Sequence, residues 1–538
     1  MTNGLFYLEN YLVTKLFLAA LMLVWLGTWE GLEAQQADVQ KQKTDVLVTA
    51  AGKMVGEVLD ESSHLHIYRG IPFAQPPTGE LRWRPPRPAG PWDGVRECLE
   101  FGSQSAQIRQ GNVYGSEDCL YLNVWTTQAG RPDAGLPVMV WIHGGGWTGG
   151  SGGRRYYSGK AISERGVILV TVNYRLGAMG FLAHEALAKE NSQGISGNYG
   201  LMDNLLALNW IKQNISAFGG DPDNVTIFGE SAGGATVSAL CCVPQAKGLF
   251  HKAISQSPWM FGYTNPLAAR NIVHQTKRIG NVESGEMSGQ RWVEKFTDKK
   301  GVAAISELRT RDVKELFMGY SPAKLTVGNA LLPDHPLEMF KRGEQFDIPM
   351  IVGTTQHEGN YFQGGIWPKD RQVFIRKLAA FYGEQQGSEL GKAFPGEARA
   401  AAIQFVTDAW FVHPARVMLL GMEKVSSSAY QFEFRRVNHK DPSKGAPHAI
   451  EIRYVFNSLQ NAESRPKDQQ LADLCTDYWT QFAKTGNPNK LMRPRWPAYT
   501  VKQRAFLSLD HDVQVLYDIN RTVLDALDEA NQGLWRIK

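Results

Sequence analysis

Cysteine is scarce in this chain, with five among 538 residues. A fold stapled by disulfides needs a far higher density, so this chain must depend on a hydrophobic core, for which 43% hydrophobic residues are ample. The spacings Cys-x-x-Cys and His-Glu-x-x-His are also missing. The sequence therefore gives no support for a metal site, and we expect neither a metal nor an organic cofactor.

An excess of one charge is lacking too, because the formal net charge is only +4. The basic residues are spread evenly, and no basic run has aromatic residues interleaved with it. This pattern excludes nucleic acid as a partner.

Long apolar runs are absent except near the N-terminus, where Leu16–Leu26 follows Lys15 and precedes Leu32-Glu-Ala34. This order is typical of a secretory signal peptide. We predict a signal peptide over residues 1–34, a polar linker over 35–44 and a secreted or periplasmic protein. A retained N-terminal anchor is the alternative, because Glu9 and the long stretch before Lys15 are unusual for a signal; only then do we expect contact with a membrane.

Several apolar runs lack the polar alternation of a half-exposed strand: Val138–Ile142, Val167–Val172, Val225–Phe228 and Pro349–Gly353. Helical patterns such as Asn204–Asn214 lie between them. Buried strands alternating with helices predict an α/β fold whose central sheet is mostly parallel. We predict one catalytic domain over residues 45–538, with helical insertions over the carboxyl edge of the sheet at about 265–346 and 374–426.

The run Val225–Phe228 leads directly into Gly229-Glu-Ser-Ala-Gly233. Gly-x-Ser-x-Gly after a strand and before a helix is typical of a nucleophile elbow, which exposes the serine hydroxyl on a tight turn. Ser231 is therefore the predicted nucleophile, and the N–H of Ala232 would help to hold an oxyanion. Ser151 fits the same pattern, but no strand precedes it, which indicates a flexible glycine loop.

A second glycine-rich segment, Trp141–Gly150, follows a predicted strand and would supply the other half of the oxyanion hole. For the general base, His448 lies late in the chain, where the order Ser, acid, His requires it, although His413 and His439 are rivals. For the acid, Glu358 follows a buried strand, with a solvated loop glutamate as an equal alternative.

Together these residues resemble the type-B carboxylesterase/cholinesterase family of α/β-hydrolases from about residue 45 to 518. The motifs that carry the resemblance are Tyr68-Arg-Gly-Ile-Pro-Phe-Ala74, Glu117-Asp-Cys-Leu-Tyr-Leu-Asn-Val124, the glycine loop after His143, Asn173-Tyr-Arg-Leu-Gly177, Asn214-Ile-Ser-Ala-Phe-Gly-Gly-Asp-Pro222, the Ser231 elbow, and His448 with Tyr454-Val-Phe456.

The resemblance implies an α/β-hydrolase fold and a cofactor-free serine esterase that acts on small-molecule esters through an acyl-enzyme. Its catalytic residues would be Ser231, Glu358 and His448. The oxyanion donors would be Gly145, Gly146 and Ala232.

The resemblance also implies some structural pairs: a Cys98–Cys119 disulfide, which is the bridge we expect among the five cysteines, and the ion pairs Arg69–Glu117 and Arg175–Asp203. Beside the nucleophile, Glu230 would be a buried, hydrogen-bonded carboxylate. The second disulfide of animal members has no cysteines available here, which favours a bacterial-type member.

Two other function classes stay open at this point: a catalytically inactive binding module of the same family, and an enzyme with the same triad that cleaves amides or carbamates or transfers acyl groups. Trp147, Trp259 and Phe261 are candidates to line the substrate pocket. The sequence does not identify the ester or the oligomeric state.

Overall fold

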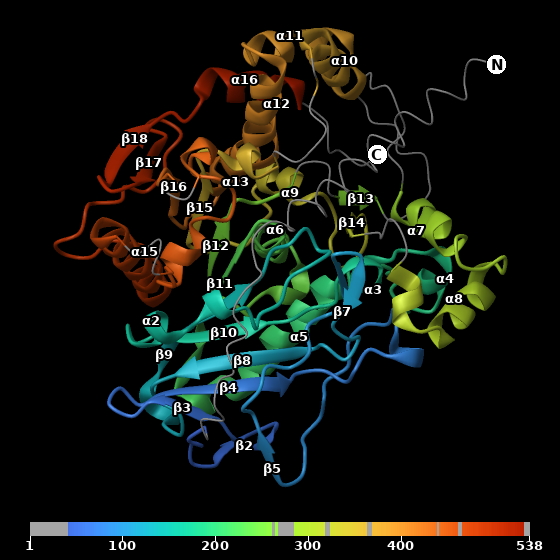
Figure 1. Ribbon diagram of the computed structural model, residues 1–538, viewed down its shortest axis with the longest axis vertical. Helices are drawn as coiled ribbons and strands as arrows, with labels where there is room; N and C mark the ends of the chain where they lie inside the picture. The colour runs from blue at the N-terminus through green and yellow to red at the C-terminus, as the bar shows by residue number, and fades with distance from the viewer. Residues whose placement is uncertain are drawn as a thin grey trace.

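An open, twisted sheet forms the centre of the molecule (Figure 1). The computed structural model describes residues 41–260, 264–266, 284–317, 323–362, 368, 370–437, 441–460 and 465–531. Within them the sheet has eleven strands in the order β18-β17-β16-β15-β12-β11-β9-β10-β8-β4-β3. Their bounds, in chain order, are β3 Glu57–Asp60, β4 Leu65–Pro72, β8 Tyr121–Thr126, β9 Leu136–Ile142, β10 Ile168–Val172, β11 Gly220–Glu230, β12 Lys252–Gln256, β15 Met350–Thr355, β16 Ala429–Phe434, β17 Ala505–Leu509 and β18 Gln514–Tyr517.

In the order of the sheet, every neighbouring pair between β17 and β10 is parallel. The outer pairs are antiparallel: β18 with β17 at one end, and β10 with β8 at the start of the other. The four predicted strands correspond to β9, β10, β11 and β15, while β12 was missed. Along β9, Val138 and Val140 contribute to one core and Met139 and Trp141 to another. Both faces are covered, which is why these runs are apolar throughout instead of alternating.

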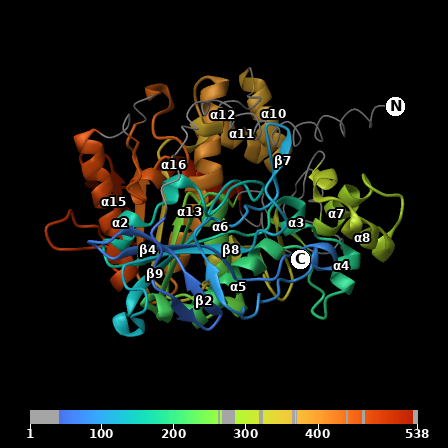
Figure 2. The same ribbon diagram turned by 60° about the horizontal axis from the view of Figure 1, so that its bottom comes forward.

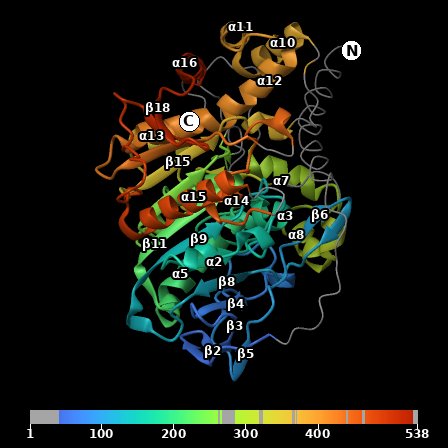
Figure 3. The ribbon, with the colours of Figure 1, turned by 60° about the vertical axis from the view of Figure 1, so that its left-hand side comes forward.

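Helices cover both faces of the sheet, as Figure 3 shows from the side. On one face lie α5 Tyr199–Asn214, α6 Ala232–Leu240, α9 Pro336–Arg342 and α13 His413–Met422, whose side chains share a core with β9 and β11. On the other lie α2 Lys160–Ser163, α14 Ile452–Val455 and α15 Pro466–Thr485. The predicted α/β-hydrolase architecture is confirmed.

The remaining helices and strands lie outside the central sheet and the helices assigned above to its two faces (Figure 2). They are the short strands β1 Leu47–Thr49, β2 Gly52–Val55, β5 Val95–Glu97, β6 Gln107–Arg109, β7 Asn112–Tyr114, β13 Thr264–Pro266 and β14 Leu325–Val327, and the helices α3 Gly177–Phe181, α4 Glu185–Lys189, α7 Gly285–Val293, α8 Gly301–Thr310, α10 Arg371–Tyr382, α11 Glu384–Ala393, α12 Ala398–Thr407 and α16 Arg521–Ala530. In the described part of the chain, no helix is both long and apolar enough to cross a bilayer.

In the parts that the structure describes, both predicted insertions consist mainly of helices and connecting loops. In the second, α12 reaches the carboxyl edge of the sheet, since the Thr407 hydroxyl accepts a hydrogen bond from the Gly359 N–H, just after β15. In the first, α8 packs beside α4 and holds Arg82 through the carbonyl of Leu308.

One of the two implied ion pairs is wrong. Arg69 pairs with Glu57, because β3 and β4 are antiparallel with Glu57 opposite Ile67, which makes Arg69 its diagonal neighbour. Glu117 instead binds Arg82, whose Nε lies 2.7 Å from Oε1. The implied Arg175–Asp203 pair is confirmed, with a shortest N–O distance of 2.7 Å and both side chains buried.

The implied Cys98–Cys119 disulfide is also absent: all five cysteines lie in the described residues, and each is a buried free thiol. Cys98 follows β5 and is held by the backbone of Val55 and Arg69, whereas Cys119 precedes β8 near the Arg175–Asp203 pair. Burial raises the pKa of Cys98 to about 12 and that of Cys119 further still, so both thiols stay protonated and unreactive.

Candidate active site

The turn between β11 and α6 puts Ser231 in an unusual backbone conformation, with φ 59° and ψ −123°. Its N–H donates to the carbonyl of Gln256 at 3.0 Å, and its own carbonyl receives the Ala235 N–H. Gly233 cannot be replaced, since a Cβ there would lie 2.1 Å from the Ile142 carbonyl oxygen. A strained turn held this tightly is the geometry of a nucleophile elbow.

The glycine loop after β9 packs directly against this turn. A Cβ on Gly144 would lie 3.1 Å from the Cβ of Ser231, and the next two residues, Gly145 and Gly146, have φ of 111° and 62°. These conformations favour glycine and let the loop approach the serine closely. His143 anchors the loop, because its ring stacks on Tyr174, and burial lowers the pKa of His143 to about 3.

Glu358 and His448 meet beside the serine. Nδ1 of His448 lies 2.5 Å from Oε2 of Glu358, and both side chains are buried. The other carboxylate oxygen of Glu358 accepts hydrogen bonds from the Ser257 hydroxyl at 2.6 Å and from the Thr355 N–H at 2.8 Å. The contact of Ser257 with Glu358 was not predicted. Ser257 follows β12, a strand that the sequence pattern does not reveal, so nothing in the sequence marks its position.

Nε2 of His448 faces Glu230, at 3.0 Å from Oε1. No hydrogen bond between the Ser231 hydroxyl and His448 is formed among the described residues. Burial disfavours a charged imidazole, but Glu230 and Glu358 outweigh it and raise the pKa of His448 well above its usual range.

A third carboxylate, Glu451, is buried three residues after His448, at the N-cap of α14. It accepts a hydrogen bond from the Gln256 amide at 2.9 Å, so Gln256 holds Ser231 with its backbone and Glu451 with its side chain. Burial, followed by the charges of Glu230 and Glu358, raises the pKa of Glu451 to about 8. Glu451 is therefore harder to ionise than an exposed glutamate.

Aromatic rings surround the imidazole and the glycine loop. Phe411 lies 4.7 Å from the His448 ring, and Phe362 lies 5.7 Å from it. Trp259 packs with Phe411 in the same cluster, and its ring lies 3.1 Å from where Gly146 would carry a Cβ. A π-helix, Asp408–Val412, brings Phe411 to this position.

A second candidate pocket residue, Trp147, lies outside this cluster. Trp147 is buried against Phe181 in the main core, and its indole N–H donates to Thr236 at 3.0 Å. Phe261 lies outside the described residues.

The alternative catalytic residues occupy structural positions. The Ser151 hydroxyl bonds to Asn173, which shapes the glycine loop. His413 pairs with Asp528 at 3.0 Å, whereas His439 lies outside the described residues. No cluster of three metal-ligating side chains occurs in the part of the chain that the structure describes.

Comparison with known proteins matches residues 43–527 to the model of the carboxylesterase family. The para-nitrobenzyl esterase of Bacillus subtilis (strain 168) is 33% identical over 489 residues, covering 88% of this chain and 96% of the relative. The fumonisin B1 esterase of Sphingopyxis macrogoltabida is 33% identical, covering 82% and 83%.

Among solved structures, a thermophilic para-nitrobenzyl esterase superposes with a TM-score of 0.76 and 31% identity, covering 90% of this chain and 99% of the other. Both para-nitrobenzyl esterases fit the prediction of a bacterial-type member. The chain belongs to the carboxylesterase family of α/β-hydrolases and is a carboxylic ester hydrolase.

Proposed function

We propose that this enzyme hydrolyses small-molecule esters through an acyl-enzyme on Ser231, with His448 as general base and Glu358 as its carboxylate partner. The observation that carries the proposal is the contact of Glu358 with Nδ1 of His448, beside the strained Ser231 turn. A carboxylate on Nδ1 fixes the tautomer that leaves Nε2 free to accept a proton.

In the proposed first half-reaction, Nε2 of His448 takes the proton of the Ser231 hydroxyl as its oxygen attacks the ester carbonyl. The N–H groups of Gly145, Gly146 and Ala232 hold the oxyanion, and the imidazolium then protonates the departing alkoxide. Water repeats the cycle on the acyl-enzyme and releases the acid. A rotation of His448 from Glu230 toward Ser231 precedes attack, consistent with catalytic hydrogen bonds that tighten only when substrate is bound.

The direct test is Ser231→Ala, assayed with a chromogenic ester, together with organophosphate labelling of the wild-type enzyme. We expect turnover to fall by about 10⁴-fold or more and the label to reside on the peptide that contains Ser231. Persisting turnover, or a label elsewhere, would refute the mechanism.

We further propose that the aromatic cluster of Trp259, Phe362, Trp410 and Phe411 contacts the group on one side of the scissile bond. Its rings crowd His448 and Gly146, so the cluster favours compact or planar groups there. A series of esters with acyl and alcohol groups of increasing bulk tests this, since Trp259→Ala should relieve a size limit on one series only.

Export is a separate proposal, because residues 1–34 have the anatomy of a signal peptide and lie outside the described residues. N-terminal sequencing of the protein recovered outside the cytoplasm should begin near residue 35. An intact N-terminus on exported protein would favour a retained anchor.

A further inference from the structure

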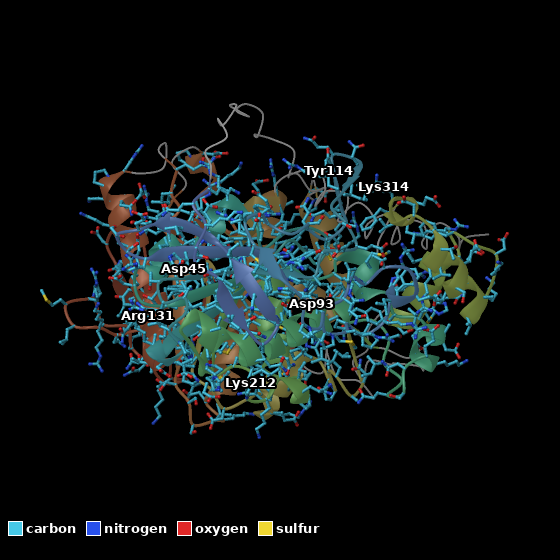
Figure 4. The ribbon with its side chains drawn as sticks, turned by 90° about the horizontal axis from the view of Figure 1, so that it is seen from below. Asp45, Asp93, Tyr114, Arg131, Lys212 and Lys314 are labelled. Atoms are coloured by element: carbon cyan, nitrogen blue, oxygen red, sulfur yellow. The ribbon has the colours of Figure 1, made fainter. Side chains whose placement is uncertain are left out.

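The loop between α15 and β17 carries two large apolar side chains with almost no cover. Leu491 and Met492 are 92% and 101% exposed, whereas the next most exposed large hydrophobic residue in the described chain, Val48, is 63% exposed. The loop projects beyond the ribbon of α15 at the left of Figures 1 and 4. Apolar side chains held this far into water indicate a surface that something else covers.

Hydrogen bonds fix the base of this loop, so the fold itself holds the two apolar side chains in the solvent. The side chain of Asn489 accepts the Trp496 N–H at 2.7 Å and donates to the Trp496 carbonyl at 2.9 Å. The hydroxyl of Tyr478 donates to the carbonyl of Pro494 at 2.6 Å, and the Trp496 ring is buried and bonded to Gln431. Residues 490–495 therefore form a short projection on a rigid stem, which we call the tip.

The tip is basic. Its sequence is Lys490-Leu-Met-Arg-Pro-Arg495, without an acidic residue. Arg493 pairs with Asp477, but within the described residues Lys490 and Arg495 pair with no acid. Burial, followed by the nearby charge of Lys490, lowers the pKa of Lys484 at the stem.

The tip and the catalytic residues lie at opposite edges of the sheet. Gly486, at the end of α15, packs against Pro349 immediately before β15, and Tyr499 bonds to Ala429 at the start of β16. Glu358 follows the other end of β15, whose six residues span about 20 Å. A surface that binds the tip leaves the catalytic edge directed into water.

We propose that the tip docks the enzyme onto an anionic lipid surface, with Leu491 and Met492 in the interface and Lys490 and Arg495 on the headgroups. Apolar side chains flanked by cations match the two layers of such a surface, where the acyl chains lie beneath negatively charged headgroups. The proposal is independent of the proposed catalytic mechanism, because it concerns the opposite edge of the sheet.

The test uses the full chain with Met492→Cys labelled by an environment-sensitive fluorophore. The five native cysteines are at most 2% exposed, so the introduced thiol is the accessible one. Mixing with vesicles of phosphatidylcholine and phosphatidylglycerol should raise and blue-shift its emission, while pure phosphatidylcholine vesicles or high salt should weaken this response. The matched control is Val302→Cys on α8, 54% exposed and distant in the fold, which should not respond.

A second measurement is vesicle sedimentation of Leu491→Ser/Met492→Ser beside wild type. Partitioning should fall about tenfold or more, since two apolar side chains lose their burial, with unchanged hydrolysis of a water-soluble ester. An unresponsive label at position 492, an equal response at position 302, or equal partitioning of the double variant would overturn the proposal. An unresponsive label would instead favour a protein partner for the tip.

Discussion

Ser257 offers a sharp test of the proposed catalytic role of Glu358 and His448. Its hydroxyl donates to Oε1 of Glu358 at 2.6 Å in a fully buried setting, while Oε2 faces His448. Ser257→Ala removes this donor and leaves the Thr355 N–H as the other donor to Oε1. The substitution deletes one oxygen and adds no bulk, so the surrounding packing is preserved.

A hydrogen bond to a charged group contributes about 1.5–3 kcal/mol. In the proposed mechanism the carboxylate matters most when His448 becomes an imidazolium, so we expect the loss mainly in the transition state. That free energy corresponds to a decrease of roughly 10- to 150-fold in kcat/KM. The decrease should appear in kcat and not in KM, because Ser257 is fully buried and contacts Glu358.

The control is Ser255→Ala on β12, the strand that ends just before Ser257. Ser255 is equally buried, but its hydroxyl bonds to Gly234 and Ser238, so it does not touch Glu358. Steady-state kinetics on a chromogenic ester and urea unfolding should be measured for both variants. Unchanged kcat in a folded Ser257→Ala enzyme, or an equal loss in Ser255→Ala, would refute the reasoning.

Three further predictions concern charge, stability and redox state. Glu230→Gln removes a negative charge that raises the pKa of His448. The acid limb of the pH profile of kcat/KM, where the imidazole becomes protonated, should therefore move to lower pH. An acid limb at the same pH as in the wild type would contradict this. Asp203→Asn leaves Arg175 buried without its charged partner. The free energy of unfolding, measured in urea, should fall by about 3–5 kcal/mol, and a decrease below about 1 kcal/mol would show that the pair is dispensable. Without reductant, thiol titration should detect all five cysteines after denaturation and almost none before; two fewer after denaturation would indicate a disulfide.

The central sheet was predictable because its physical signal is local. Parallel strands buried on both faces must be apolar throughout, and Val138–Ile142 and Val225–Phe228 have this pattern. The elbow was predictable for a similar reason, since Gly229 and Gly233 leave room that a Cβ would fill. Strand β12 was missed because Lys252, Ser255 and Gln256 interrupt its apolar character, although all three are buried.

Pairings between distant segments could not be predicted in the same way. Arg69 binds Glu57 because β3 and β4 form a hairpin, and the short strand β3 has no strong sequence signal. Cys98 and Cys119 are both buried near the antiparallel end of the sheet, but each is fixed by a different set of neighbours. Neither result follows from spacing, because the partner is decided by register and packing.

The position of Glu230 follows from the same turn that displays Ser231. A tight strand-to-helix turn points successive side chains in different directions. When the Ser231 side chain projects from the turn, the side chain of Glu230 must therefore point into the buried space under the glycine loop. There Glu230 lies next to Gly144 and within 3.0 Å of Nε2 of His448, while Glu358 holds Nδ1. Two carboxylates on one imidazole stabilise its charged form, which opposes proton uptake from the serine at low pH but favours the imidazolium once attack begins. The turn therefore sets both the place of the proposed nucleophile and the charge that its proposed base encounters.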